Sequence, residues 1–314
     1  MPRIFGLFMC LLCHSEVLNG IQIEDTPTLL IAGSIAAAVC VARKGKSTEK
    51  KEETKIHTED SRIHRNGRYD RSREKKMAKI IAGIFGGYLF LVFLAPIAMP
   101  ADSVPELSGR ANAFDYMTED GATGWGNQNW SDNGKLGHNQ SAHGGSFVWS
   151  ELNPIWAFTY GFGDLNCHQK HHRSWEINGN QLAFCVRDVG IFAGAAIGAA
   201  IFGRFGLNRW TLRDTFLSII PDEWLVRTYE KNRRGITSLG IAAIFVIPMG
   251  VDGFTQLLTD YESNNVLRLV TGLGFGLILG WIFVASLCAR PKDFNNSGQV
   301  ILPGGARFQL IEEE

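Results

Sequence analysis

Charged residues are missing from long stretches of this 314-residue sequence. Its 31 basic and 31 acidic side chains cancel and its mean hydropathy is −0.01, yet five apolar windows of 15 to 21 residues contain no Asp, Glu, Lys or Arg. The absence of net charge removes the electrostatic argument for a nucleic-acid partner. Six scattered cysteines form neither a disulfide-dense scaffold nor the paired CxxC motifs of a zinc ribbon. Together these absences favour a polytopic membrane protein, whose partner is the lipid bilayer, over a soluble globular protein.

The apolar windows predict an all-α fold with four transmembrane helices. A helix needs about 20 apolar residues to cross the hydrocarbon core, where every backbone amide must be satisfied within the segment. Two windows reach that length easily. Two are shorter: one lengthens to residue 207 if Arg204 snorkels, and the other carries Pro248 near its end. The four predicted spans are 80–100, 189–207, 235–251 and 269–289.

Three further features of the sequence lie in or before these spans. Pro248 lacks a backbone N–H, so we expect the third span to break there and residues 249–256 to be unwound. The Ala-rich window 26–42 is a candidate fifth span. Residues 4–13 resemble the apolar core of a signal peptide or an uncleaved N-terminal anchor.

Loop charges predict the orientation, because short cytoplasmic loops retain Lys and Arg. Residues 43–79 contain 14 basic and 7 acidic side chains, whereas 101–166 contain two basic and eight acidic ones. Residues 204–234 are again basic, with seven against four, and 254–264 contain two acidic residues and no basic one. We therefore expect a multi-pass protein of the cell membrane with residues 167–188 on the extracytoplasmic side.

This pattern divides the chain into six segments. The stretch after the first hydrophobic segments mixes Lys, Arg and Glu with almost no apolar residues, so it cannot bury a core. The predicted segments are the N-terminal hydrophobic segments 1–42, a basic cytoplasmic linker 43–79, a transmembrane helix 80–100, a polar extracytoplasmic loop 101–153, a helical membrane domain 154–289 and a cytoplasmic tail 290–314.

Glycines at four-residue spacing predict a contact between two of the spans. Gly190, Gly194 and Gly198 form one such series, and Gly272, Gly276 and Gly280 form the other. Helices in lipid associate where small residues allow the backbones to approach closely. We therefore expect the second and fourth spans to lie side by side.

Ionisable and soft side chains gather at the predicted outer surface. Residues 167–176 contain cysteine, histidine, lysine, arginine and glutamate, and Cys185 and Asp188 follow at the mouth of the second span. Asp252 and Arg268 lie at the outer ends of the third and fourth spans, where a charge is best tolerated when it is paired. We expect these residues to form one cluster.

Three blocks of the second half carry a pattern of their own. They read CHQKHHRSWEINGNQLAFCVRDVGIFAG from Cys167, PMGVDGFTQ from Pro248 and ESNNVLRLVTGLGFG from Glu262. In order and spacing they resemble the family of membrane proteins catalogued as domain of unknown function 2085, over roughly residues 156–289. The resemblance implies a membrane location and a shared polar site, but no established activity. It maps the family pattern onto Cys167, His168, Gln169, Arg173, Ser174, Cys185, Gly190, Asp252, Gly253, Gln256, Ser263, Asn265, Arg268, Thr271 and Gly272.

The chain departs from the family pattern at Asp188. The resemblance implies a second cysteine three residues after Cys185, and Asp188 stands at that position. This disfavours a dithiol redox cycle on Cys185. Metal binding remains compatible, because a carboxylate can replace a thiolate as a zinc ligand.

The first functional hypothesis is a zinc site. Its ligands would be Cys167, His168, Cys185 and Asp188, with His171 or His172 as substitutes. An open zinc position could activate water against a lipid headgroup or a lipid-linked substrate. In that mechanism Asp252 is the candidate general base, and Arg173 or Arg268 would hold an anionic group of the substrate.

Two alternatives remain open. In the first, Cys167 and Cys185 form a structural disulfide and the charged residues form a salt-bridged cap over the helices. In the second, the protein is a transporter component in which Asp252 and Arg268 line a path. Because the spans contain no visible inverted repeat, we rank the transporter hypothesis last.

Overall fold

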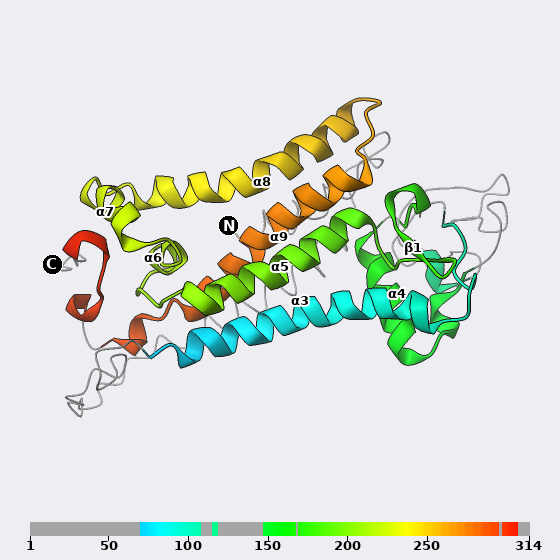
Figure 1. Cartoon of the computed structure of the whole chain (residues 1–314), viewed down its shortest axis with the longest axis horizontal. Coiled ribbons are helices and arrows are strands. Elements are labelled where there is room, and N and C mark those ends of the chain that lie inside the picture. Colours follow the sequence, from blue (N-terminus) through cyan, green and yellow to red (C-terminus); the bar gives the residue numbers. More distant parts are fainter. Residues whose placement is uncertain (1–69, 108–114, 119–146, 168, 295–296, 307–314) are drawn as a thin grey trace, which may run out of the picture. The chain divides into compact units, whose positions relative to one another are not determined.

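The computed structural model describes residues 70–107, 115–118, 147–167, 169–294 and 297–306 (Figure 1). The two N-terminal candidates, 4–13 and 26–42, lie outside these residues. Within the described residues the fold is almost entirely helical. Its α-helices are α3 (Ser72–Ala98), α4 (Pro154–Asn166), α5 (Val186–Phe205), α6 (Leu212–Leu217), α7 (Asp222–Glu230), α8 (Arg234–Leu258) and α9 (Asn265–Cys288). The strands β1 (Glu176–Ile177) and β2 (Asn180–Gln181) pair as an antiparallel hairpin, and short 3-10 turns connect the other elements.

The chain forms two compact units. In the described part, unit 1 consists of Leu91–Val186 and Gly250–Asn265, and unit 2 contains Arg187–Met249, Val266 onward and the chain up to Phe90. Within the described residues, each boundary between the units falls inside one of the four long helices. Unit 1 contains α4 and the β-hairpin, whereas unit 2 contains α6, α7 and most of the long helices.

The four predicted spans are confirmed. By length and composition, α3, α5, α8 and α9 are each long and apolar enough to cross a membrane. Helix α3 begins eight residues before the predicted window, at Ser72. The polar first turn of α3 makes tertiary contacts in unit 2. Glu74 is buried there, and its Oε1 accepts the Asn208 N–H at 2.9 Å. Hydropathy does not detect such a turn, because its polar groups are satisfied by tertiary contacts.

The expected break at Pro248 is wrong. Helix α8 runs without interruption from Arg234 to Leu258, with Pro248 inside it. Proline removes one intrahelical hydrogen bond, but membrane helices tolerate that loss where the surroundings and the remaining turns keep the backbone helical. Asp252 therefore lies on a helix rather than on an unwound segment.

The predicted contact between the two glycine series is confirmed within unit 2 (Figure 1). A Cβ atom added at Gly194 on α5 would lie 2.2 Å from the Leu273 carbonyl oxygen, and one added at Gly276 on α9 would lie 2.1 Å from the Ile191 carbonyl oxygen. Both neighbours are backbone atoms, which cannot rotate away. The glycines therefore let α5 and α9 pack backbone to backbone.

Candidate metal centre

Three potential metal ligands meet where α4 ends and α5 begins. Cys167 follows α4 directly, Cys185 precedes α5, and Asp188 lies in the first turn of α5. The two Sγ atoms and a carboxylate oxygen of Asp188 all lie within 4.8 Å of one another, and all three residues are buried. Among the described residues this is the single group of three such ligands. Asp188 is one helical turn from Cys185, so its position beside that residue is fixed by the local chain.

The two cysteines are linked through the backbone. The Cys185 N–H donates to Cys167 Sγ at an N···S distance of 3.2 Å, and neither cysteine is in a disulfide. The structure therefore contains the Cys167–Cys185 proximity that both the metal and the disulfide hypotheses require. It contains the pair in its unbridged form.

A close backbone approach holds the Cys185 segment against α4. Gly163 on α4 has room only for hydrogen, since a Cβ atom there would lie 1.9 Å from the Ala183 carbonyl oxygen. That same oxygen accepts a hydrogen bond from Gln169 Nε2 at 2.5 Å. Gln169 and Ala183 are each two residues from one of the cysteines. Their hydrogen bond therefore clamps together the two segments that supply the sulfur ligands.

Buried amide side chains extend this clamp into the hairpin. Gln181 Nε2 donates to the Gln169 carbonyl oxygen at 3.4 Å, and Gln181 Oε1 accepts the Leu107 N–H at 2.9 Å. Tyr160 on α4 donates to the Gln181 carbonyl oxygen at 2.9 Å. Burial raises the pKa of Tyr160 well above its usual range, so it stays a neutral donor.

The hairpin is anchored in turn to the end of α3. Asn180 Nδ2 donates to the carbonyl oxygens of Pro96 and Pro100 at 3.0 and 2.9 Å, and its Oδ1 accepts the Val104 N–H at 2.7 Å. The turn itself has Asn178 and Gly179 at φ values of 56° and 69°, the signature of an Asn-Gly type I′ hairpin. We did not predict this hairpin from the sequence, although its Asn-Gly pair is a recognised hairpin signal.

A second polar group surrounds Glu262 in the loop between α8 and α9. Glu262 Oε1 accepts from Arg173 Nε at 2.9 Å and lies 2.8 Å from His172 Nε2. Burial alone would raise the pKa of Glu262, but the hydrogen bonds from Arg173 and His172 outweigh it, so the pKa lies below its ordinary value. The positive charge of Arg173 is thus already engaged by a carboxylate.

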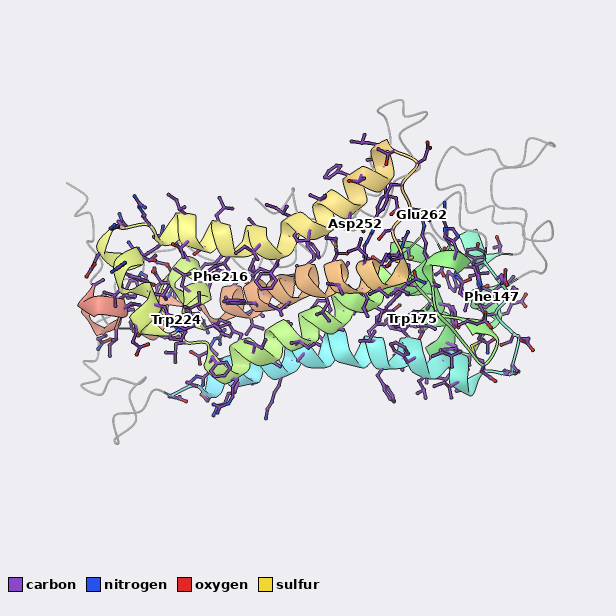
Figure 2. All side chains as sticks on the ribbon, turned by 45° about the horizontal axis from the view of Figure 1, so that its top comes forward. Phe147, Trp175, Phe216, Trp224, Asp252 and Glu262 are labelled. Atoms are coloured by element: carbon purple, nitrogen blue, oxygen red, sulfur yellow. The ribbon has the colours of Figure 1, made fainter. Side chains whose placement is uncertain are left out.

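Asp252 is buried on α8, and Figure 2 labels it on this helix and Glu262 in the loop that follows. The Tyr261 hydroxyl donates to Asp252 Oδ1 at 3.3 Å. Arg268 is buried in the first turns of α9, in unit 2.

Two groupings of the predicted site residues can be described. Cys167, Cys185 and Asp188 come together, while Arg173 pairs with Glu262. His168, the fourth predicted ligand, lies outside the described residues. The sequence did not reveal the clamp made by Gln169, because a hydrogen bond to a distant carbonyl leaves no pattern in the chain.

Four helices that are long and apolar enough to cross a membrane are typical of a multi-pass helical membrane protein. The sequence model of the family described as "Predicted membrane protein (DUF2085)" matches residues 167–282. An uncharacterized protein of Methanocaldococcus jannaschii is 33% identical over 134 residues, which cover 41% of this chain and 71% of that protein. An uncharacterized protein of Methanothermobacter thermautotrophicus is 33% identical over 111 residues, which cover 35% of this chain and 78% of that protein. The chain belongs to this family, and no solved structure matches it.

Proposed function

We propose that this membrane protein binds a zinc ion through Cys167, Cys185 and Asp188. The observation that carries the proposal is the convergence of two sulfur atoms and a carboxylate oxygen within 4.8 Å in a buried position. Thiolate and carboxylate are both established zinc ligands. The fourth position would be taken by His168, as the sequence predicts, or by a water molecule.

The required rearrangement is small. With Zn–S bonds of about 2.3 Å and Zn–O bonds of about 2.0 Å, tetrahedral ligand atoms lie roughly 3.3–3.8 Å apart. The three ligand atoms now lie within 4.8 Å of one another, so each distance between them would shorten from that limit by about 1 Å. A change of side-chain rotamer is sufficient for such a shift, so the backbone clamp at Gln169 can stay in place.

The electrostatic setting also supports a cation. Two thiolates and a carboxylate would bring three negative charges into a buried site, which is costly without compensation. The start of α5 supplies a partial positive charge from the helix dipole, since Cys185 precedes the helix and Asp188 lies in its first turn. A divalent cation would supply the larger part of the compensation.

Metal analysis of the purified full-length protein tests the proposal. We expect one zinc per chain, lost on Cys185→Ser and retained on Cys288→Ser. Cys288 is the matched control, because it is also a buried cysteine outside any disulfide but lies on α9 in unit 2. A folded wild-type protein that binds neither zinc nor cobalt would overturn the proposal.

The structural disulfide predicts a different result in the same preparation. The chain has six cysteines, so the metal-bound form should expose six thiols to alkylation after unfolding in chelator. A Cys167–Cys185 disulfide would leave two of them unreactive until reduction.

The finer proposal is that the zinc site acts on a lipid or lipid-linked substrate from the extracytoplasmic side, within a membrane domain of residues 154–289. Arg173 is less available for an anionic substrate because Glu262 already engages it. Arg268 would therefore hold the anionic group of the substrate, and Asp252 would be the general base. Asp252→Asn and Arg268→Gln should then abolish turnover of a lipid-linked substrate while zinc content stays at the wild-type level. If both variants instead alter ion flux through vesicles, the transporter alternative is favoured.

A further inference from the structure

Helix α7 exposes a tryptophan that the packing of unit 2 does not use. Trp224 is 78% exposed and is the most exposed tryptophan among the described residues. Figure 2 labels its place in the chain. The opposite face of α7 is buried, because Leu225 and Tyr229 belong to the hydrophobic core of unit 2. The orientation of α7 is therefore fixed, with Trp224 held outward.

The chain ties this helix to the start of a membrane span. Helix α7 ends at Glu230 and α8 begins at Arg234. The connection is folded back on itself, since the Arg233 N–H donates to the Thr228 carbonyl oxygen at 2.8 Å. Four residue steps reach about 14 Å when fully extended, and this turn is shorter. Because each interfacial layer of a bilayer is roughly 5–8 Å deep, the end of α7 lies at or next to the headgroups.

The exposed charges around α7 are mainly basic. Arg213, Arg227, Lys231 and Arg233 are exposed, against exposed Glu223 and Glu230, which leaves a net of +2. The other two acidic groups are engaged: Asp222 pairs with Arg209 and the buried Asp214 pairs with Arg234. Arg213 also lies close to the start of α8, with its Nη1 3.7 Å from a Cβ position at Gly235.

We infer that α7 lies in the headgroup layer of the membrane, with Trp224 inserted among the lipids and its basic neighbours on anionic phospholipid phosphates. Tryptophan is favoured at the membrane interface, where its ring is buried and its N–H stays hydrated. Arginine and lysine beside an exposed aromatic side chain are typical of helices that lie on anionic membrane surfaces. The net basic charge selects a lipid surface with negative headgroups over a neutral one.

Fluorescence quenching in vesicles tests the position of Trp224. The full-length protein and its Trp224→Phe variant are reconstituted in phosphatidylcholine, and the difference between their emission spectra isolates Trp224. We expect this component to be quenched by phospholipid brominated near the headgroup end of the acyl chains, and only weakly by aqueous iodide. Trp281→Phe is the matched control, because Trp281 is buried and donates to the Phe216 carbonyl oxygen. Its component should respond weakly to both quenchers.

Two results would overturn the inference. Strong quenching by iodide without quenching by bromolipid would place Trp224 in water. Protection from both quenchers would mean that protein, such as a second copy of the chain, covers α7. Because Trp224 is exposed, the Phe variant should melt at the wild-type temperature.

The lipid charge is tested with the same signal. Quenching of Trp224 by brominated phosphatidylglycerol is compared with quenching by brominated phosphatidylcholine, each mixed with unlabelled lipid. Each basic residue near the surface contributes up to about a fivefold preference for anionic lipid, so Arg227→Gln, Lys231→Gln and Arg233→Gln together should bring the ratio close to one. Lys292→Gln, an exposed charge in the C-terminal tail, should leave the ratio unchanged. An equal ratio in the wild-type protein and the triple variant would refute the assignment to anionic headgroups.

Discussion

The contact between α5 and α9 predicts a large effect for a single methyl group. Replacing Gly276 by Ala would place a Cβ atom 2.1 Å from the Ile191 carbonyl oxygen, whereas ordinary contacts begin at 3.4 Å. The two helices must therefore separate locally by about 1.3 Å, the difference between these distances. The obstructing atom belongs to the backbone, so no change of rotamer can relieve the overlap.

The cost follows from the packing that this separation breaks. A gap of about 0.5–1 Å already removes a quarter to a half of the dispersion energy of each contact along the seam. Overpacking of this kind costs about 1–3 kcal/mol, and we take the upper end because the neighbour is rigid. Alanine regains about 1 kcal/mol over glycine inside a helix. The net expectation is a loss of about 2 kcal/mol.

A matched substitution separates the two terms. Gly83 on α3 has nothing within 4 Å of its Cβ position, so Gly83→Ala should be neutral or stabilising by up to about 1 kcal/mol. Unfolding in mixed micelles, followed by helical circular dichroism, measures both variants. The double variant Gly194→Ala, Gly276→Ala should lose less free energy of unfolding than the two single variants added together, because one separation of the helices relieves both overlaps. Equal stability of Gly276→Ala and Gly83→Ala would refute the backbone contact.

Three further predictions concern the site and its sidedness. Gln169→Met removes the donor to the Ala183 carbonyl oxygen, and we expect zinc affinity, measured by competition with a chelating dye, to fall about 10- to 100-fold; unchanged affinity would show that the clamp does not position the ligands. Because the pKa of Glu262 is lower in the folded protein, its stabilisation is present above the ordinary glutamate value and is lost as the pH falls through the lower folded value. Unfolding followed from about pH 6 to pH 3 should therefore show the wild-type protein converging on Glu262→Gln, and curves that stay parallel would contradict this. An impermeant maleimide applied to intact cells should label cysteines introduced at 121–145 and spare those introduced at 44–76; the reverse pattern would place the cluster in the cytoplasm.

The sequence predicts the long helices well because their signal is local. A charge-free window reports the apolar middle of a span, and the positions of α3, α5, α8 and α9 agree with those windows. The ends agree less well, because polar turns satisfied by tertiary contacts, such as the one at Glu74, look like loops in a hydropathy profile. The predicted helix break at Pro248 was wrong for a related reason, since the rule that proline breaks helices applies best to helices in water.

The site was predictable only in part. Cys167, Cys185 and Asp188 could be grouped because they flank the same predicted membrane surface and have the chemistry of metal ligands. The pairing of Arg173 with Glu262 and the clamp between Gln169 and Ala183 are contacts between segments that no spacing rule connects. The Asn178–Gly179 turn is the exception, since its signal is local and was present in the sequence.

The carboxylate at Asp188 determines how the zinc site and the disulfide hypothesis relate to each other. With a carboxylate at this position, Cys185 has no thiol partner within its own helical turn, and Cys167 is the thiol that the structure places beside it. Oxidation would therefore join the end of α4 to the start of α5 and use both sulfur ligands at once. A bound zinc ion would in turn hold both thiolates and prevent their oxidation. Because the same two sulfur atoms serve both states, formation of the Cys167–Cys185 disulfide should remove the zinc site, whereas reduced protein can take up zinc.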